Sequence, residues 1–152
     1  MREESDGLLL RYEDRDTDGT GELRVEARYR QFSGASSAWF SDNELLRFAE
    51  QLLTHPLGDA QLHISGGTGS DDTFEMHVGL TVALGMRGQV AVVAHLATPT
   101  NPEINPGSSR SQARVEVLTS YGDLQRFSAE LRQLVAGTAG QARLEAVTPA
   151  QD

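Results

Sequence analysis

A capped amphipathic segment that occurs twice constrains the fold more than any other feature of this sequence. The first copy, residues 41–52, reads SDNELLRFAEQL, and the second, residues 120–131, reads SYGDLQRFSAEL. The copies start at Ser41 and Ser120, which are 79 positions apart, and both contain an acidic residue in the first turn followed by Leu, Arg, Phe and Leu at matching positions. One helix that recurs at a fixed offset predicts an internally duplicated domain.

Local signals define both helices. Ser41 with Glu44 predicts a capping box, and Phe40 with Leu45 predicts a hydrophobic staple at the same end. Gly137 stands where a left-handed glycine ends many helices. The buried stripes should recur at i, i+3, i+4 and i+7. They comprise Leu45, Leu46, Phe48, Ala49, Leu52 and Leu53 in the first helix and Leu124, Phe127, Leu131, Leu134 and Val135 in the second.

The segments that precede and follow the helices read as strands. Alternation of apolar and polar residues predicts strands near residues 8–12, 22–32, 60–65, 74–82, 113–117 and 142–147, and residues 89–96 read as a central strand that is apolar on both faces. Residues 33–37, 66–72 and 99–109 are rich in Gly, Ser or Pro and read as loops. We therefore predict an α+β fold, with a mostly antiparallel sheet of about eight strands, two helices and duplicated β-β-α-β halves.

The chain length of 152 residues favours one domain. We expect a disordered N-terminus at residues 1–6, a single domain at residues 7–148 and a short tail at residues 149–152. The pseudo-repeats should cover about residues 7–66 and 72–148.

Composition restricts the classes of partner. The formal net charge is −9, and the thirteen basic residues are scattered, which argues against a nucleic-acid groove. The acidic charge either keeps the protein soluble, which we favour, or attracts a basic protein partner. The sequence has no cysteine, which excludes disulfides and thiolate sites. No apolar run near the N-terminus is long enough for a signal peptide or a membrane span, so a cytoplasmic location is expected.

Asp14, Asp16 and Asp18 match the first half of a calcium-binding loop, because alternate carboxylates can converge on a hard cation. The second half of the pattern is missing, since Val25 stands where a bidentate glutamate belongs. We favour an acidic hairpin turn here and keep a metal-binding or small-ligand protein as the alternative function.

Other residues suited to chemistry give weaker patterns. His63, His77 and His95 lie in three predicted strands, with His63 and His77 on the outward positions, but their spacing does not match a zinc site. The glycine-rich run at residues 66–70 is followed by two aspartates and no lysine, which disfavours phosphate binding. No Gly-x-Ser-x-Gly elbow occurs. We therefore expect a protein without a cofactor and without catalytic activity.

Two regions are candidates for partner binding. The first is the acidic turn at Asp14, Asp16 and Asp18. The second is the loop at residues 99–109, and its candidates are Asn101, Glu103 and Asn105. Trp39 is either part of the core, which we favour, or an exposed anchor for a partner.

The order of a hairpin, the Trp39-Phe40 pair with its helix, and the Gly88-x-Val90-x-Val92 strand resembles the WapI-type immunity-protein family. The closing helix with Leu124, Phe127 and Leu131 completes the resemblance, which covers residues 7–147. It implies a cytoplasmic bacterial protein that neutralises a toxin by binding it, without catalysis. The family also contains proteins without an identified toxin, and it offers no site residues to transfer. A homodimer through an open sheet edge is a further hypothesis.

Overall fold

The computed structural model describes residues 5–53, 62–68, 74–84, 89–100 and 110–147. The chain forms eight strands and two helices, in the α+β class predicted from the sequence. The first five elements are β1 (Gly7–Arg15), β2 (Thr20–Tyr29), β3 (Phe32–Ser41), α1 (Asp42–Gln51) and β4 (Leu62–Thr68). The next five are β5 (Glu75–Leu84), β6 (Val90–Ala97), β7 (Gln112–Thr119), α2 (Tyr121–Ala136) and β8 (Ala142–Glu145).

The strands form two antiparallel sheets of four. The first sheet has the order β3-β2-β1-β8, and the second has the order β4-β5-β6-β7. The same element order, β-β-β-α-β, occurs in residues 7–68 and again in residues 75–145, and the last strand of each half joins the sheet formed by the other half. The prediction of β-β-α-β halves therefore gave each half one strand too few. All three strands before α2 were predicted, whereas β3 before α1 was missed because residues 33–37 read as a loop.

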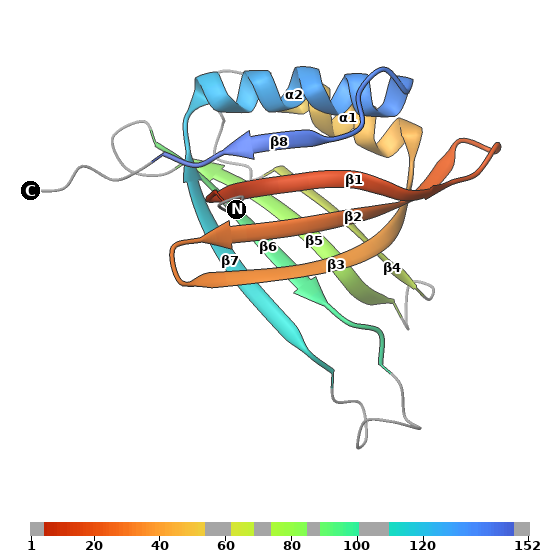
Figure 1. Cartoon of the computed structure of the whole chain (residues 1–152), viewed down its shortest axis with the longest axis horizontal. Coiled ribbons are helices and arrows are strands. Elements are labelled where there is room, and N and C mark those ends of the chain that lie inside the picture. Colours follow the sequence, from red (N-terminus) through yellow and green to blue (C-terminus); the bar gives the residue numbers. More distant parts are fainter. Residues whose placement is uncertain (1–4, 54–61, 69–73, 85–88, 101–109, 148–152) are drawn as a thin grey trace, which may run out of the picture.

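The two sheets face each other at a steep angle, and the helices lie together along one end (Figure 1). Residues from both sheets and both helices make one hydrophobic core, which includes Val25, Val78, Val117 and Phe127. β6 lies between β5 and β7 inside the second sheet, as its apolar character predicted. The inner faces of the sheets and the buried stripes of the helices thus form a single domain core.

Both helix starts follow the predicted chemistry. Ser41 and Glu44 form the reciprocal capping box of α1, and the Ser120 side chain accepts from the Asp123 amide at the start of α2. Gly137 ends α2 with φ 82°. The predicted stripes are buried except for Leu46 and Leu53, which are 40% and 38% exposed. These two leucines lie outside the strip of α1 that α2 and the sheets cover.

The prediction of a loop at residues 33–37 is wrong, because this segment is the middle of β3. Its inward-facing residues, Gly34 and Ser36, lie against the second sheet. A Cβ atom added to Gly34 would lie 2.7 Å from the Ala113 side chain, and the Ser36 hydroxyl donates to the Ala97 carbonyl at 2.7 Å. Similarly, Gly66 belongs to β4 and not to a turn, and a Cβ there would lie 2.9 Å from Phe40.

The helices cross where the two copies of the repeated segment meet. The buried Ser128 hydroxyl donates to the Ala49 carbonyl at 2.6 Å, and these residues occupy matching positions, 79 apart. Matching residues of two related units touch only near an axis that relates the units. This contact is therefore what a pseudo-twofold arrangement of the helices requires, while the duplication itself stays a prediction.

We expect Ser128→Ala to lower the free energy of unfolding by about 1–2 kcal/mol, because it removes a buried hydrogen bond without adding volume. Urea denaturation measures this change. Ser33→Ala, at an exposed serine of β3, is the matched control and should change stability by less than about 0.5 kcal/mol. Equal stability of the two variants would show that the hydrogen bond between the helices contributes little.

Candidate functional site

One end of the molecule concentrates acidic side chains. The β1–β2 hairpin projects past the body of the protein at the end where α1 begins (Figure 1). Residues 13–22 and 42–44 contribute seven carboxylates and one arginine, Arg15. We call these residues, together with Trp39, the acidic end. The acidic end includes the predicted hairpin turn with Asp14, Asp16 and Asp18.

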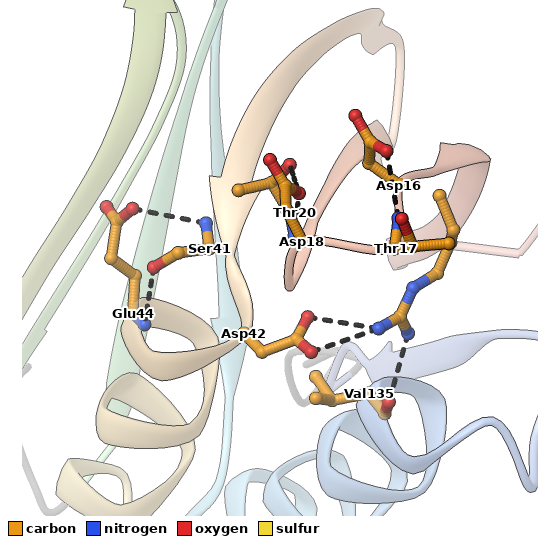
Figure 2. A network of polar contacts seen from close by, with 9 residues as sticks. Asp16, Thr17, Asp18, Thr20, Ser41, Asp42, Glu44 and Val135 are labelled. Atoms are coloured by element: carbon orange, nitrogen blue, oxygen red, sulfur yellow. Dashed lines mark hydrogen bonds and ion pairs between the residues drawn. The ribbon is translucent and has the colours of Figure 1, made fainter.

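The carboxylates of the hairpin turn bond to their own loop. Asp16 Oδ1 accepts from the Thr17 amide at 2.9 Å, and Asp18 Oδ1 accepts from both the amide and the hydroxyl of Thr20, at 3.1 Å and 2.6 Å (Figure 2). These short-range bonds are typical of aspartate in turns. In these bonds, carboxylate oxygens of Asp16 and Asp18 accept from Thr17 and Thr20 of the same loop and so stabilise the loop backbone.

The structure gives no support to the metal alternative. No group of three His, Asp or Glu side chains within the described ranges, Asp14, Asp16 and Asp18 included, lies close enough together to hold a metal ion. His63 lies 2.9 Å from the Thr81 hydroxyl, and His77 lies 2.7 Å from Glu75, so the first two histidines have separate partners.

Arg15 ties the hairpin to both helices. Its guanidinium donates to both carboxylate oxygens of Asp42 at 3.1 Å and to the Val135 carbonyl at 2.9 Å (Figure 2). It also lies over the Tyr12 ring, 4.3 Å from the centroid. Asp42 is in the first turn of α1 and Val135 in the last turn of α2, so one side chain fixes three elements. Nothing in the local sequence predicts these long-range partners.

We expect Arg15→Gln to destabilise the protein by about 1 kcal/mol, because a bidentate ion pair is lost at a site that is one-third exposed. A double-mutant cycle with Asp42→Asn, measured by urea denaturation, should give a coupling energy of about 0.5–1 kcal/mol. Arg47→Gln, at an exposed position of α1, is the control. A coupling energy near zero would show that the pair does not hold the hairpin.

Trp39 is exposed, contrary to the core position that we favoured. Trp39 is 44% exposed, whereas its neighbour Phe40 is 2% exposed and lies in the core, as the predicted hydrophobic staple requires. Trp39 pairs with Glu22 across the β2–β3 ladder on the outer face of the first sheet. Two positions earlier on this face, the Ser37 hydroxyl donates to Glu13. Glu22 is therefore the cross-strand neighbour of Trp39, while Glu13 lies near Ser37, whose cross-strand partner is Arg24.

The other half of this outer face carries arginines. This half contains a shallow depression of about 820 Å³, whose lining includes Ser5, Leu9, Arg11, Glu26, Arg28 and Arg143. Arg11 and Arg24 lie 3.6 Å and 3.2 Å from Glu26, and Arg28 lies 3.8 Å from Asp6. The outer face of the first sheet is thus divided into an arginine-containing half with internal ion pairs and the acidic half around Trp39.

A second polar cluster lies near the long β6–β7 connection. The prediction that His77 points outward is wrong, since it is 4% exposed. The β4–β5 register shifts between Gly66 and Gly67, which leaves His77 as an extra residue outside the regular alternation. Glu75 accepts from the Thr100 hydroxyl and, at 3.0 Å, from the Thr100 amide, and its carboxylate lies 3.9 Å from Arg110.

These contacts change the acidity of Glu75. Hydrogen bonds from the Thr100 hydroxyl, from His77 and from the Thr100 amide lower the pKa of Glu75 from 4.5 to about 2, and nearby Arg110 adds to the effect. The contacts favour the charged form and therefore stabilise the folded state wherever Glu75 is ionised. The cluster fixes the start of β5 to the ends of the β6–β7 connection.

This pKa predicts how stability depends on pH. The contribution of Glu75 should be complete above about pH 4.5 and should decline as the pH falls toward 2, because the unfolded carboxyl takes up its proton first. The difference in unfolding free energy between wild type and Glu75→Gln should follow this course in urea denaturation from pH 7 to pH 2. The exposed Glu116→Gln is the control substitution. A difference that is independent of pH across this range would contradict the assignment.

The loop candidates Asn101, Glu103 and Asn105 lie outside the described residues. Of the described candidates, the structure brings together Asp14 and Trp39 on the outer face of the first sheet, through their shared neighbour Glu22. Sequence reasoning missed Glu13 and Glu22 as neighbours of Trp39. The strand alternation of residues 22–32 already placed Glu22 on the charged face, and this signal could have linked it to Trp39 once β3 was recognised as a strand.

Comparisons with protein-family models, curated proteins and solved structures found no match to this chain. The resemblance to the WapI-type immunity family therefore stays a prediction. Among the described helices, none has the length and apolar character needed to cross a membrane.

Proposed function

We propose that this protein binds a basic protein partner through the acidic end and that it has no catalytic role. The observation that carries the proposal is the position of Trp39, a large exposed aromatic residue that pairs with Glu22 on a sheet face where Glu13 bonds to Ser37, two positions away. Exposed tryptophans are frequent anchors of protein interfaces, since burying the indole contributes a large apolar area. The acidic surroundings select the charge of the partner.

The charge distribution supports a partner with clustered Lys or Arg. Seven carboxylates and a single arginine come from residues 13–22 and 42–44, and Asp42 is already paired with Arg15. A field of one sign speeds the encounter with a protein of the opposite sign and disfavours partners of the same sign. Partner capture should therefore weaken as the salt concentration rises.

An immunity-type role is the specific form of this proposal. The sequence resemblance to the WapI-type family suggests that the partner is a toxin, and many binding surfaces that inhibit basic domains are acidic. The polar clusters of the described residues also fit a binding protein, because the contacts of Arg15 with Asp42 and of Glu75 with Thr100 join separate segments of the fold. We assign these clusters to stability, and Trp39 with the other carboxylates of the acidic end to recognition.

The proposal predicts that Trp39→Ala reduces partner capture at least about tenfold, as expected for an interface anchor. Tagged wild type and variant would be incubated with lysate of the source organism at about 0.05 M salt and eluted at about 0.5 M salt. The matched control is Leu46→Ala, which removes an exposed apolar side chain from α1. The captured protein would then be purified and its affinity for each variant measured.

A basic protein that elutes with salt, and that Leu46→Ala retains and Trp39→Ala loses, is the expected result. Equal capture by wild type and both variants would contradict a role for Trp39. Capture of acidic proteins only, or binding that is insensitive to salt, would contradict the proposed charge of the partner.

A further inference from the structure

β3 forms one edge of the first sheet, and among the described strands it pairs only with β2. The Asp42 amide donates to the Gly19 carbonyl at 2.8 Å, directly beyond the Thr20 and Ser41 pair. Because bonded pairs alternate along an antiparallel ladder, the even-numbered residues of β3 are the ones that bond to β2. The Ser41 amide agrees with this assignment, since it donates to Glu44 and not to β2.

The backbone N–H and C=O groups of Ser33, Ala35, Ser37 and Trp39 therefore point away from the sheet. In the part of the chain that the structure describes, no backbone group outside β3 bonds to these four residues. Their side chains lie on the outer face, and Ser33, Ala35 and Trp39 are exposed. The unpaired backbone N–H and C=O groups of these four alternate residues could pair with a further strand.

β3 also lacks the features that usually protect an edge strand. It contains no charged residue and no proline over ten positions, in a chain whose residues are 23% charged. The other edges differ from it. β8 is four residues long and packs against α2, β7 contains Arg114 and Glu116, and β4 has a register shift at Gly66. The open edge of β3 is thus a specific property of this strand.

We propose that this edge binds an extended basic segment of the partner as a fifth strand of the first sheet. The inference rests on the proposed function, because it uses the same surface. Trp39 is the last of the four outward-pointing residues of β3, and Glu22 lies beside it on β2. Alternate side chains of an added strand would lie on the same face as Trp39 and Glu22. A Lys or Arg beside Trp39 would meet Glu22 and the acidic end. Farther along the edge, Ser33 and Ser37 pair with Arg28 and Arg24, so the basic residues of the segment belong at the Trp39 end, and the backbone would supply affinity.

A second copy of this chain fits the edge less well than a basic segment. β3 has no basic side chain to pair with Glu22, and each added copy brings a net charge of −9. Charge complementarity therefore favours a basic strand as the occupant.

The test uses a synthetic ten-residue peptide of alternating lysine and valine with blocked termini. An analogue of the same charge, N-methylated at every residue so that neither edge can donate a hydrogen bond, is the matched control. Trp39 is the only tryptophan, so its fluorescence reports binding at this edge. The second arm uses Ala35→Pro, which removes an N–H that points away from β2 and leaves the β2–β3 ladder intact.

We expect the unmodified peptide to bind wild type, and both N-methylation and Ala35→Pro to weaken binding at least tenfold, with circular dichroism confirming that the variant is folded. Equal binding of the two peptides would overturn strand addition and leave the proposed basic partner intact. Absence of binding by both peptides would also overturn strand addition. The proposed function is decided separately, by the Trp39-dependent capture of a basic protein. A wild-type dimer that Ala35→Pro converts to monomer would assign the edge to a second copy and overturn the proposal.

Discussion

The crossing of α1 and α2 holds the two sheets of this protein together. α1 follows a strand of the first sheet and precedes a strand of the second, while α2 connects the sheets in the opposite direction. The hydrogen bond from Ser128 to Ala49 lies at the point where these two connections meet. The close approach of β3 to β7, where Gly34 leaves room for Ala113, depends on the same arrangement.

The net charge of −9 is distributed unevenly over this framework. On the outer face of the first sheet, the arginines of one half are matched by Glu26 and Asp6, whereas the half around Trp39 carries excess acid. Arg15 neutralises Asp42 and fixes the hairpin against both helices, so the remaining carboxylates project from a rigid support. Rigid presentation lowers the entropy that a partner must overcome on binding.

Local chemistry made the helices and most strands predictable. Ser41, Glu44 and Gly137 act within one or two helical turns, and the structure confirms each of them. The errors come from long-range packing. Small residues in β3 look like a loop until the second sheet lies against them, and the extra residue His77 breaks an alternation that the sequence displays. The exposure of Trp39 and the partners of Arg15 are decided by segments far away in the chain.

The exchange of the last strands has a consequence for folding kinetics. β1 completes its sheet only by pairing with β8, and these strands come from opposite ends of the described chain. Contacts between residues so distant in sequence form slowly, because a long loop must close before the pairing contributes stability. During synthesis, one edge of β1 therefore stays unpaired until the ribosome has made β8. The first sheet, which contains the first three strands to be synthesised, is therefore completed after the second sheet.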